Sequence, residues 1–450
     1  MGNKSYNKRI MTSHHAGNRD SFASSFGVLM ALVGSAIGLG NLWRFPYLAG
    51  VNGGAAFIII YVAFVFIICL PIMLAEFVVG RRSHANTYGA FAVLAPGSKW
   101  PMIGIITVAA ASIILAFYSV VGGWTADYLL QALAFKLPDS EGTMAFFQKV
   151  TASPFRPQIF TVLFLLLTAG VLMTGIKNGI EKYSKILMPL LFVVVIVIAI
   201  RSMTLSGAGE GLKFLFKPDF SKVTGTTVLE ALGQAFFSSS IGIGTILTYA
   251  SYVNKQENII GASFMTSLAN VVFAFLAGVA IMPAVFAFGL SPAEGPGLAF
   301  TTLPQVFDKL PGGELIAILF FFMMLVAALT SSISLLEVPV TYLTEEFKLS
   351  RKVAVVVAFA VCLVMALFCS LYEVVFNFCD GLTANYLMPI SALLVVIFVG
   401  WRMKKSDVED ELSNSYSLPY PRWLYDIIFY LLRFLAPVVI VVVLLYGLLS

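Results

Sequence analysis

Charged side chains are scarce in this chain, and their scarcity indicates its class. Asp, Glu, Lys and Arg make up 11% of its 450 residues, whereas a soluble domain has about 25%. Hydrophobic residues make up 59%. The net charge of +5 is small, and the basic residues lie in short segments between apolar runs, so nucleic acid is not expected as a partner. The composition indicates a polytopic membrane protein.

Cysteine and histidine are also rare, which limits the available chemistry. The three histidines lie outside the apolar runs and have no metal-ligand spacing. The apolar runs contain no zinc-protease motif, no nucleophile elbow and no carboxylate pair at helical spacing, so an enzyme is not expected. Thiols packed as small hydrophobic groups are favoured over a disulfide or metal framework, because CxxC spacing is absent among Cys69, Cys362, Cys369 and Cys379.

Long apolar runs fill most of the sequence. A helix that crosses the roughly 30 Å hydrocarbon core of a bilayer needs about 20 residues. Eleven runs reach this length, so the sequence predicts eleven transmembrane helices. They lie approximately at 23–50, 55–80, 101–135, 157–176, 183–206, 227–253, 258–290, 313–345, 352–371, 375–401 and 423–449.

Lys and Arg are distributed unequally between the segments that connect these runs. If the N-terminus is internal, the internal segments hold 18 basic residues and the external segments hold 8. Positive residues favour the cytoplasmic side of a membrane. We therefore expect a multi-pass protein of the cell membrane with a cytoplasmic N-terminus, and an odd number of spans then places Ser450 outside.

Glycine interrupts two of the runs in a similar way. The stretch GSAIGLGN covers residues 34–41, and SSSIGIGT covers residues 238–245. Each stands in the first helix of a five-helix unit, so the second unit enters the membrane from the opposite side, as in an inverted repeat. Close helix packing through small residues is the alternative. The predicted divisions are a cytoplasmic segment at 1–22, repeats at 23–206 and 207–401, and an eleventh helix with its preceding loop at 402–450.

The glycines of both stretches should allow the backbone to unwind. Glycine inside a helix costs up to about 1 kcal/mol relative to alanine. Unwound backbone cannot face lipid, so it must line a cavity or be enclosed by protein. Its free carbonyls suit a small cation, and the N–H groups at the ends of half-helices suit a carboxylate. The two stretches are therefore expected to bind a zwitterion and a cation together.

Three stretches of the chain resemble the neurotransmitter:sodium symporter family, and most closely its bacterial multihydrophobic amino-acid transporters. They are GSAIGLGNLWRFPYLAGVNGGAAF, GQAFFSSSIGIGTILTYASY and ALTSSIS. The resemblance implies an all-α integral membrane protein with a 5+5 inverted repeat, the LeuT-like fold, with broken first and sixth helices. It also implies a sodium-coupled symporter that imports aliphatic and aromatic L-amino acids by alternating access. A channel and a sensor without transport are the competing interpretations.

The resemblance implies two sodium sites made of neutral oxygens. The first sodium would lie beside the substrate carboxylate, with ligands from Ala36, Asn41, Ser238 and Asn270. The second would use the carbonyls of Gly34, Ile37 and Ala327 and the hydroxyls of Thr330 and Ser331. Hydrogen bonds from these two hydroxyls to their own helix are the alternative.

The resemblance also implies a substrate pocket for an α-amino acid. Gly38 stands where the monoamine branch of the family carries an aspartate, which leaves room for the substrate's own carboxylate. The N–H groups of Leu39 and Gly40 and the hydroxyl of Tyr118 would bind that carboxylate. Carbonyls near Ala36 and Phe237, with Ser240, would bind the amino group. Ser238 borders the pocket, and its predicted apolar walls are Ile114, Phe237, Ile243 and Leu335.

Charged residues near both ends of the pathway resemble the family's gates. Arg44 and Asp380 would close the outer side with Phe237 as a lid, and Arg19, Glu345 and Tyr252 would close the cytoplasmic side. Ordinary solvated charge is the alternative for both groups.

Two further features concern the support of the first break and the start of the fifth span. By the resemblance, Glu76 supports the unwound backbone of the first helix. Gly179 and Pro189 frame the start of the fifth span, where proline removes a backbone hydrogen bond and favours unwinding. We expect this end of the fifth span to open a water path to the second sodium.

A chloride site is left open, because Ala274 stands where relatives carry an acid or a serine. Tyr61, Gln234 and Ser238 remain, and Glu230 or Glu337 are candidates to supply the negative charge. The expected partners are an amino acid and the lipid bilayer, with the protein a monomer or a weak oligomer.

Overall fold

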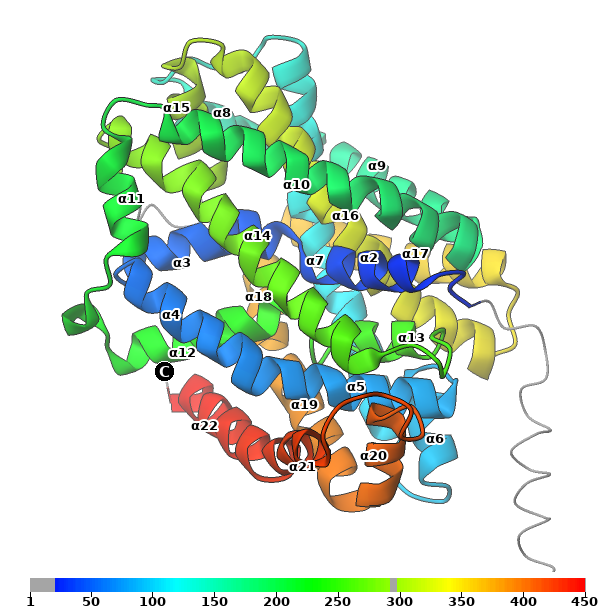
Figure 1. Cartoon of the computed structure of the whole chain (residues 1–450). Helices are drawn as coiled ribbons and strands as arrows, with labels where there is room; N and C mark the ends of the chain where they lie inside the picture. Colours follow the sequence, from blue (N-terminus) through cyan, green and yellow to red (C-terminus); the bar gives the residue numbers. More distant parts are fainter. Residues whose placement is uncertain (1–20, 292–297, 450) are drawn as a thin grey trace, which may run out of the picture.

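The computed structural model describes residues 21–291 and 298–449, and within these ranges the chain is helical without strands. Nine helices of the described part are long and apolar enough to cross a membrane. They are Ala55–Ser83, Met102–Leu133 (α7), Arg156–Met173 (α9), Ile176–Met203, Ile259–Ala287 (α14), Gly313–Glu346 (α16), Arg351–Leu371 (α17), Glu373–Arg402 and Arg422–Leu445. Figure 1 shows these helices packed side by side in one body.

Several of these spans are built from shorter pieces. The span Ala55–Ser83 contains α4 (Ala55–Phe64), a π-helical turn η2 (Val65–Cys69) and α5 (Leu70–Ser83). The later pieces are η3 (Ile176–Glu181), α10 (Lys182–Met203), α18 (Glu373–Leu382), η6 (Thr383–Leu387), α19 (Met388–Ile397), η7 (Phe398–Arg402), α21 (Arg422–Tyr430), η8 (Leu431–Leu435) and α22 (Ala436–Leu449). Shorter helices connect the spans: α6 (Thr87–Leu94), α8 (Thr143–Ala152), α11 (Ala208–Phe216), η4 (Phe220–Lys222), α15 (Thr302–Asp308) and α20 (Lys405–Leu412).

The first predicted span is broken. Helix α2 (Ser25–Ala36) ends where Ile37 adopts extended backbone, and the chain resumes as η1 (Gly40–Arg44) and α3 (Phe45–Val51). The two parts meet at an angle of 50° and together are long enough to cross a membrane. The break therefore falls within the GSAIGLGN stretch, as its glycines predict.

The sixth predicted span is also broken. It consists of α12 (Gly225–Ser238, 14 residues) and α13 (Thr245–Ala250, 6 residues), each too short to cross a bilayer alone. Gly242 and Gly244 between them have positive φ angles of 78° and 76°, which favour glycine. Among the described helices, nine of the eleven predicted runs have a continuous counterpart and the first corresponds to the bent pair, so the sixth is the one run without a membrane-length counterpart of either kind.

The two breaks are held at the centre of the bundle by the longer helices. Helix α16 packs against α7, α2 and α13, and α14 packs against α2, α10 and η1. Figure 1 shows α7 and α16 crossing near the middle of the molecule. Residues 37–39 and 239–244 are all buried, so the short unwound segments are enclosed by protein.

Glu76 supports the second break and not the first. Its Oε1 accepts a hydrogen bond of 2.6 Å from the backbone N–H of Gly242, and the side chain is buried. The expectation that Glu76 binds the unwound backbone of the first helix is therefore wrong. The reason is geometric, because α5 packs directly against α13 at the end of the second break.

A buried ion pair joins α5 to α20. Arg81 Nε donates to Glu411 Oε2 at 2.9 Å, and the two side chains are 0% and 3% exposed. Lys255 reaches Glu411 at 2.9 Å and Asp410 at 2.7 Å from the other side. Burial opposes ionisation of Asp410, but the hydrogen bonds from Lys255 and Ser415 and the nearby positive charges together outweigh it, so the pKa of Asp410 lies below its ordinary value. Asp410 is therefore charged at neutral pH.

Candidate functional site

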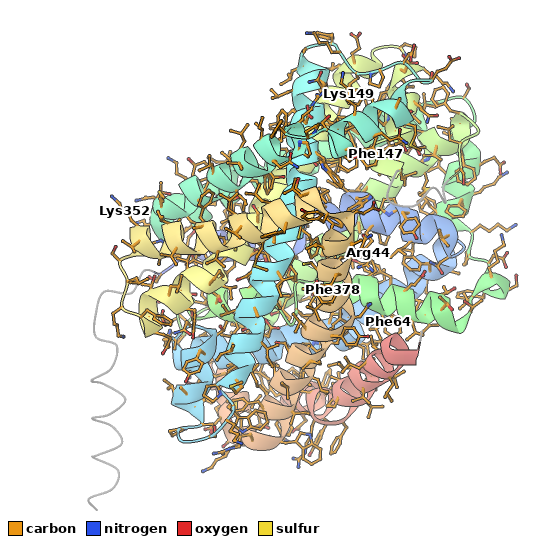
Figure 2. All side chains as sticks on the ribbon, turned by 180° about the vertical axis from the view of Figure 1, so that it is seen from behind. Arg44, Phe64, Phe147, Lys149, Lys352 and Phe378 are labelled. Atoms are coloured by element: carbon orange, nitrogen blue, oxygen red, sulfur yellow. The ribbon has the colours of Figure 1, made fainter. Side chains whose placement is uncertain are left out.

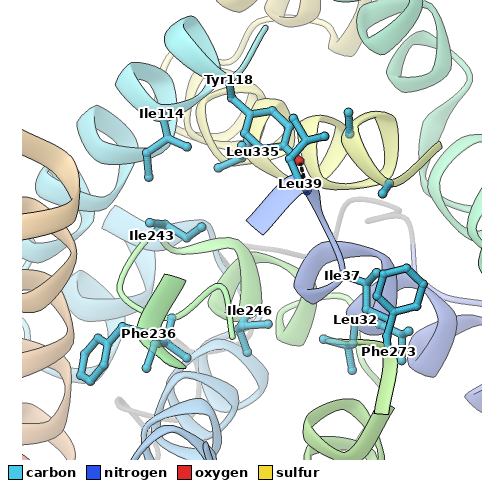
Figure 3. Packing of buried hydrophobic residues seen from close by; sticks show 14 of the residues in the cluster. Leu32, Ile37, Leu39, Ile114, Tyr118, Phe236, Ile243, Ile246, Phe273 and Leu335 are labelled. Atoms are coloured by element: carbon cyan, nitrogen blue, oxygen red, sulfur yellow. Dashed lines mark hydrogen bonds between the residues drawn. The ribbon is translucent and has the colours of Figure 1, made fainter. Parts of the chain in front are cut away.

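The two breaks and the middle of α7 and α16 enclose a central cavity. Figure 3 shows Ile114 and Tyr118 of α7, Leu335 of α16 and Ile243 of the second break facing this region. All the residues predicted to bind substrate line the cavity except Leu39. The full lining is Ser35, Ala36, Gly38, Gly40, Asn41, Ile114, Tyr118, Phe237, Ser238, Ser240, Ile243, Ser331, Ser334, Leu335 and Met388.

Glycine is required in the first break because other chain segments approach it closely. A Cβ atom on Gly38 would lie 2.6 Å from Ser331 Oγ and 2.9 Å from Tyr118 Oη. A Cβ atom on Gly40 would lie 2.7 Å from two carbons of the Phe237 ring. Both distances are shorter than van der Waals contact, so a side chain at either position would displace the walls of the cavity.

Tyr118 is joined to the first break by a hydrogen bond. The backbone N–H of Leu39 donates to Tyr118 Oη at 3.1 Å, drawn as a dashed line in Figure 3. The N–H of Leu39 and the hydroxyl of Tyr118, which were predicted to bind a carboxylate together, thus lie side by side. Ser240 Oγ, predicted to bind the amino group, donates to the carbonyl of Ser35 at 2.7 Å.

Three lining residues were not predicted from the sequence. Ser35 and Ser334 hydrogen-bond to each other at 3.0 Å across the cavity wall. Ser334 stands about one helical turn after Ser331 and directly before Leu335, and that spacing was a usable signal. Met388 lies at the start of α19. If Gly242 carried a Cβ atom, that atom would lie 2.3 Å from the backbone oxygen of Met388. Nothing in the local sequence placed α19 beside the second break.

Three of the four residues predicted to bind the first sodium, Asn41, Ser238 and Asn270, form one buried cluster, and Ala36 lines the central cavity. Asn41 Nδ2 donates to Asn270 Oδ1 at 2.6 Å, and Asn270 Nδ2 donates to Ser238 Oγ at 3.2 Å. Tyr61 Oη lies 3.0 Å from the same serine oxygen. Asn41 Oδ1 is buried without a hydrogen-bond partner in the described part of the chain. A buried acceptor of this kind fits a cation, since neutral oxygens are suitable sodium ligands.

The residues predicted to bind the second sodium also lie together. Ser331 Oγ is 3.3 Å from the carbonyl oxygens of Gly34 and Ile37. A Cβ on Gly34 would be 3.3 Å from Cβ of Thr330. Thr330 Oγ1 donates within its own helix to Ala327 O at 3.1 Å. The broken end of α2 and the middle of the continuous helix α16 thus present several oxygens to one point.

Arg44 and Asp380 face a second, larger cavity on the other side of Phe237. Its volume is about 210 Å³, against about 40 Å³ for the central cavity. The Arg44 guanidinium lies 5.3 Å from the centroid of the Phe237 ring. Figure 2 shows Arg44 near the middle of the molecule, whereas Lys149 and Lys352 lie toward its edges. Leu39, the predicted residue outside the central cavity, lines this one.

At the opposite end of the pathway, two of the predicted gate residues have additional partners that the sequence did not predict. Arg19 lies outside the described residues. Glu345 accepts hydrogen bonds from the N–H of Asn86 at 2.7 Å and from its side-chain amide at 3.0 Å. Tyr252 donates to Glu337 Oε1 at 2.7 Å, and Arg351 forms an ion pair with the same carboxylate at 2.8 Å. The sequence did not predict the bond between Tyr252 and Glu337.

The candidates for a negative charge near the first sodium cluster have other partners. Glu337 is bound by Arg351 and Tyr252, and Glu230 accepts a hydrogen bond from the Asn52 amide. Gln234 Nε2 donates to the carbonyl of Gly40 at 3.1 Å. Ala274 is fully buried and adds no polar atom.

Comparison with known proteins assigns the chain to a family. The model of the sodium:neurotransmitter symporter family matches residues 19–158 and 151–450. The chain belongs to this family. The uncharacterized sodium-dependent transporter YhdH of Bacillus subtilis is 39% identical over 447 residues, covering 95% of this chain and 98% of the relative. An uncharacterized sodium-dependent transporter of Haemophilus influenzae is 35% identical, covering 94% and 97%.

A solved structure gives the same relationship in three dimensions. The crystal structure of MhsT in complex with L-phenylalanine is 40% identical to this chain and has a TM-score of 0.89. The match covers 96% of this chain and 100% of that one. The resemblance seen in the sequence is thus confirmed, as are the all-helical membrane fold and the expectation of a transporter, not an enzyme. Membership of this symporter family also implies use of sodium.

Proposed function

We propose that this symporter imports hydrophobic L-amino acids, aliphatic and aromatic, together with sodium by alternating access. The central cavity supports this specificity because its two sides differ chemically. The N–H of Leu39 and the Tyr118 hydroxyl lie at one side, where they suit a carboxylate. Ile114, Ile243, Leu335 and Met388 line the remainder. The bound L-phenylalanine of MhsT is a ligand of this chemistry in a protein of the same fold.

In this proposal each cluster of oxygens binds one sodium ion. The first ion lies between Asn41, Asn270, Ser238 and the substrate carboxylate, so ion and substrate stabilise each other's binding. The second ion lies where Ser331 meets the carbonyls of Gly34 and Ile37. This second ion connects α2 to α16, which have to separate when the inner side of the pathway opens.

The orientation of the protein is part of the same proposal. Arg44 and Asp380 face the outside, the Ser24 end of α2 faces the cytoplasm, and the membrane is the cell membrane. The two repeats at 23–206 and 207–401 form the transport unit, and 402–450 packs beside it. A monomer or a weak oligomer is sufficient, because one chain supplies every residue of both clusters.

Uptake into liposomes tests the proposed function directly. Purified protein is reconstituted, an inward sodium gradient is imposed, and uptake of labelled leucine, phenylalanine, tryptophan, glutamate, lysine and dopamine is compared. Sodium-driven accumulation of the three hydrophobic amino acids alone is expected. Equal uptake of glutamate or lysine, or uptake that persists with potassium in place of sodium, contradicts the proposal. The potassium arm also separates a symporter from a channel.

Replacing Ser331 with alanine should weaken binding of the second sodium. The change removes a hydroxyl that lies within 3.4 Å of each of the carbonyls of Gly34, Ser35 and Ile37. The sodium concentration for half-maximal uptake is expected to rise about 10- to 100-fold, the range for lost groups around a bound metal. Ser332→Ala is the matched control, because its hydroxyl bonds to Leu329 and Thr168 and not to the break. An unchanged sodium dependence in Ser331→Ala refutes the assignment.

Exchanging the charges of Arg44 and Asp380 tests their proposed role as the outer gate. Each single reversal places two like charges in one cavity and is expected to reduce uptake at least about tenfold, since like charges at close range repel. The double variant Arg44→Asp with Asp380→Arg is expected to recover part of the activity. Equal loss in the single and double variants indicates that the residues act independently.

A further inference from the structure

We propose that Glu181 is a positioning residue that holds the Ser24 end of α2 against the start of α10 and delays opening of the path to the second sodium site. This inference rests on the proposed function, because it assigns a role in sodium release. It concerns the carboxylate itself, which neither the sodium clusters nor the gates include.

The carboxylate of Glu181 makes two contacts at the beginning of α2 and a third within its own span. Its Oε2 accepts a hydrogen bond from the backbone N–H of Ala23 at 2.7 Å, and its Oε1 accepts from Ser24 Oγ at 2.9 Å. Lys185 forms an ion pair with the same oxygen at 2.5 Å. The residue is 1% exposed. A buried carboxylate is costly unless it is paired and hydrogen-bonded. The hydrogen bonds from Ala23 and Ser24 are available only while α2 stays in place.

Ser24 itself caps the helix and therefore links the carboxylate to α2. Its hydroxyl donates to Glu181 and accepts from the N–H of Gly27 at 3.1 Å. A negative group next to the N-terminal turn of a helix is also favoured by the helix dipole. The carboxylate thus stabilises the closed position of α2 through two hydrogen bonds and through its charge.

Gly27 provides the space that the carboxylate occupies. A Cβ atom at this position would lie 2.3 Å from Glu181 Oε1 and 2.4 Å from its carboxyl carbon. Gly27 has no positive φ angle, so its backbone conformation does not require glycine. The close approach of Glu181 accounts for glycine at this position.

Glu181 also stands at an irregular point of its own span. It ends the π-helical turn η3, which follows Gly175 with a φ angle of 91°, and α10 beyond it contains Pro189. Both features weaken the backbone hydrogen bonding of this segment. Unwinding of η3 would withdraw the carboxylate from α2, whose other end carries the Gly34 and Ile37 carbonyls. Release of the carboxylate and exposure of the sodium site are thereby linked.

Thiol labelling at Met188 measures this opening without measuring transport. Met188 is fully buried on α10, and its sulfur lies 3.4 Å from the position of a Cβ on Gly34. Met188→Cys is introduced into a background in which the native cysteines are replaced by serine or alanine. A small charged methanethiosulfonate then labels the purified full-length protein in detergent, with and without sodium.

Glu181→Ala, Glu181→Gln and Gly27→Ala are each expected to increase the labelling rate, by about tenfold for Glu181→Ala. Gly27→Ala should have no further effect in the Glu181→Ala background, because the group it displaces is absent. This loss of additivity separates the proposed contact from general destabilisation. Gly170→Ala, at a helical glycine with open space, and Glu210→Gln, in an exposed ion pair, are matched controls expected to label at the rate of the background.

The outcomes distinguish this inference from the proposed function. If Glu181→Ala and Gly27→Ala are labelled at the rate of the Met188→Cys background, the role of Glu181 is refuted, whether or not sodium protects the reporter cysteine. Additive effects of Glu181→Ala and Gly27→Ala refute it as well. A lack of sodium protection in the reporter background contradicts the second sodium site, while the rates without sodium still test the carboxylate. Thermal unfolding and gel filtration of each variant identify any that do not fold, and Ser24→Ala then provides a milder test with a smaller expected increase.

Discussion

Replacing Asn41 with leucine is expected to raise the sodium concentration for half-maximal uptake more than about 100-fold, because a direct ligand should matter at least as much as the groups that surround one. The side chain is fully buried, and its Oδ1 has no hydrogen-bond partner in the described part of the protein. Leucine has nearly the same shape but no oxygen. Sodium-dependent binding of labelled amino acid to the purified protein measures the effect independently of transport rate.

Asn52→Leu is the matched control for this substitution. Asn52 is also buried, but its amide donates to the Leu48 carbonyl and to Glu230, outside the sodium cluster. It is expected to lower thermal stability while leaving the sodium dependence of the folded fraction unchanged. If Asn41→Leu binds substrate with the sodium dependence of the wild type, Asn41 is a structural residue and not a ligand.

Replacing Glu411 with leucine is expected to destabilise the protein by about 3–5 kcal/mol, the usual cost of leaving one member of a buried ion pair without its partner. Arg81 has no exposed side-chain surface, and Glu411 is its carboxylate partner. The backbone oxygens of Glu257 and Glu411 that also accept from Arg81 do not neutralise its charge. The expected observation is a marked fall in the thermal unfolding temperature of the purified protein in detergent.

Two further variants show whether burial is the cause. Glu210 and Lys213 form an exposed ion pair, 67% and 68% accessible, so Glu210→Leu should change stability by less than about 1 kcal/mol. Arg81→Leu combined with Glu411→Leu should recover much of the loss, because it removes the unpaired charge. Similar unfolding temperatures for Glu411→Leu and Glu210→Leu would show that the buried pair contributes little.

Sequence reasoning succeeded for the two helix breaks, for the spans and for most of the cavity lining. The breaks at residues 34–41 and 238–245 were predicted because glycine changes local backbone preference, a property of the segment itself. Apolar length likewise predicted the spans. The sixth span consists of two short helices because the predicted break divides it. The cavity residues were carried over from a family pattern, and all but Leu39 line the central cavity.

Contacts between distant segments were the part that sequence did not predict. Glu76 was expected at the first break and contacts Gly242 in the second. Tyr252 was grouped with Glu345 and donates to Glu337. In both cases the residue type and its approximate depth were known, but several partners of similar chemistry lay at that depth, and the choice among them depended on helix packing.

The amino-acid sequence by itself determined the membrane class, the positions of the spans, the two interrupted helices and the family. These properties follow from apolar length, from glycine placement and from motifs of adjacent residues. Only the tertiary structure decided that Arg81 pairs with Glu411, that Gly27 makes room for Glu181 and that Met388 lines the cavity. Such contacts join residues that are far apart in the chain, and they depend on the angles and depths at which whole helices pack.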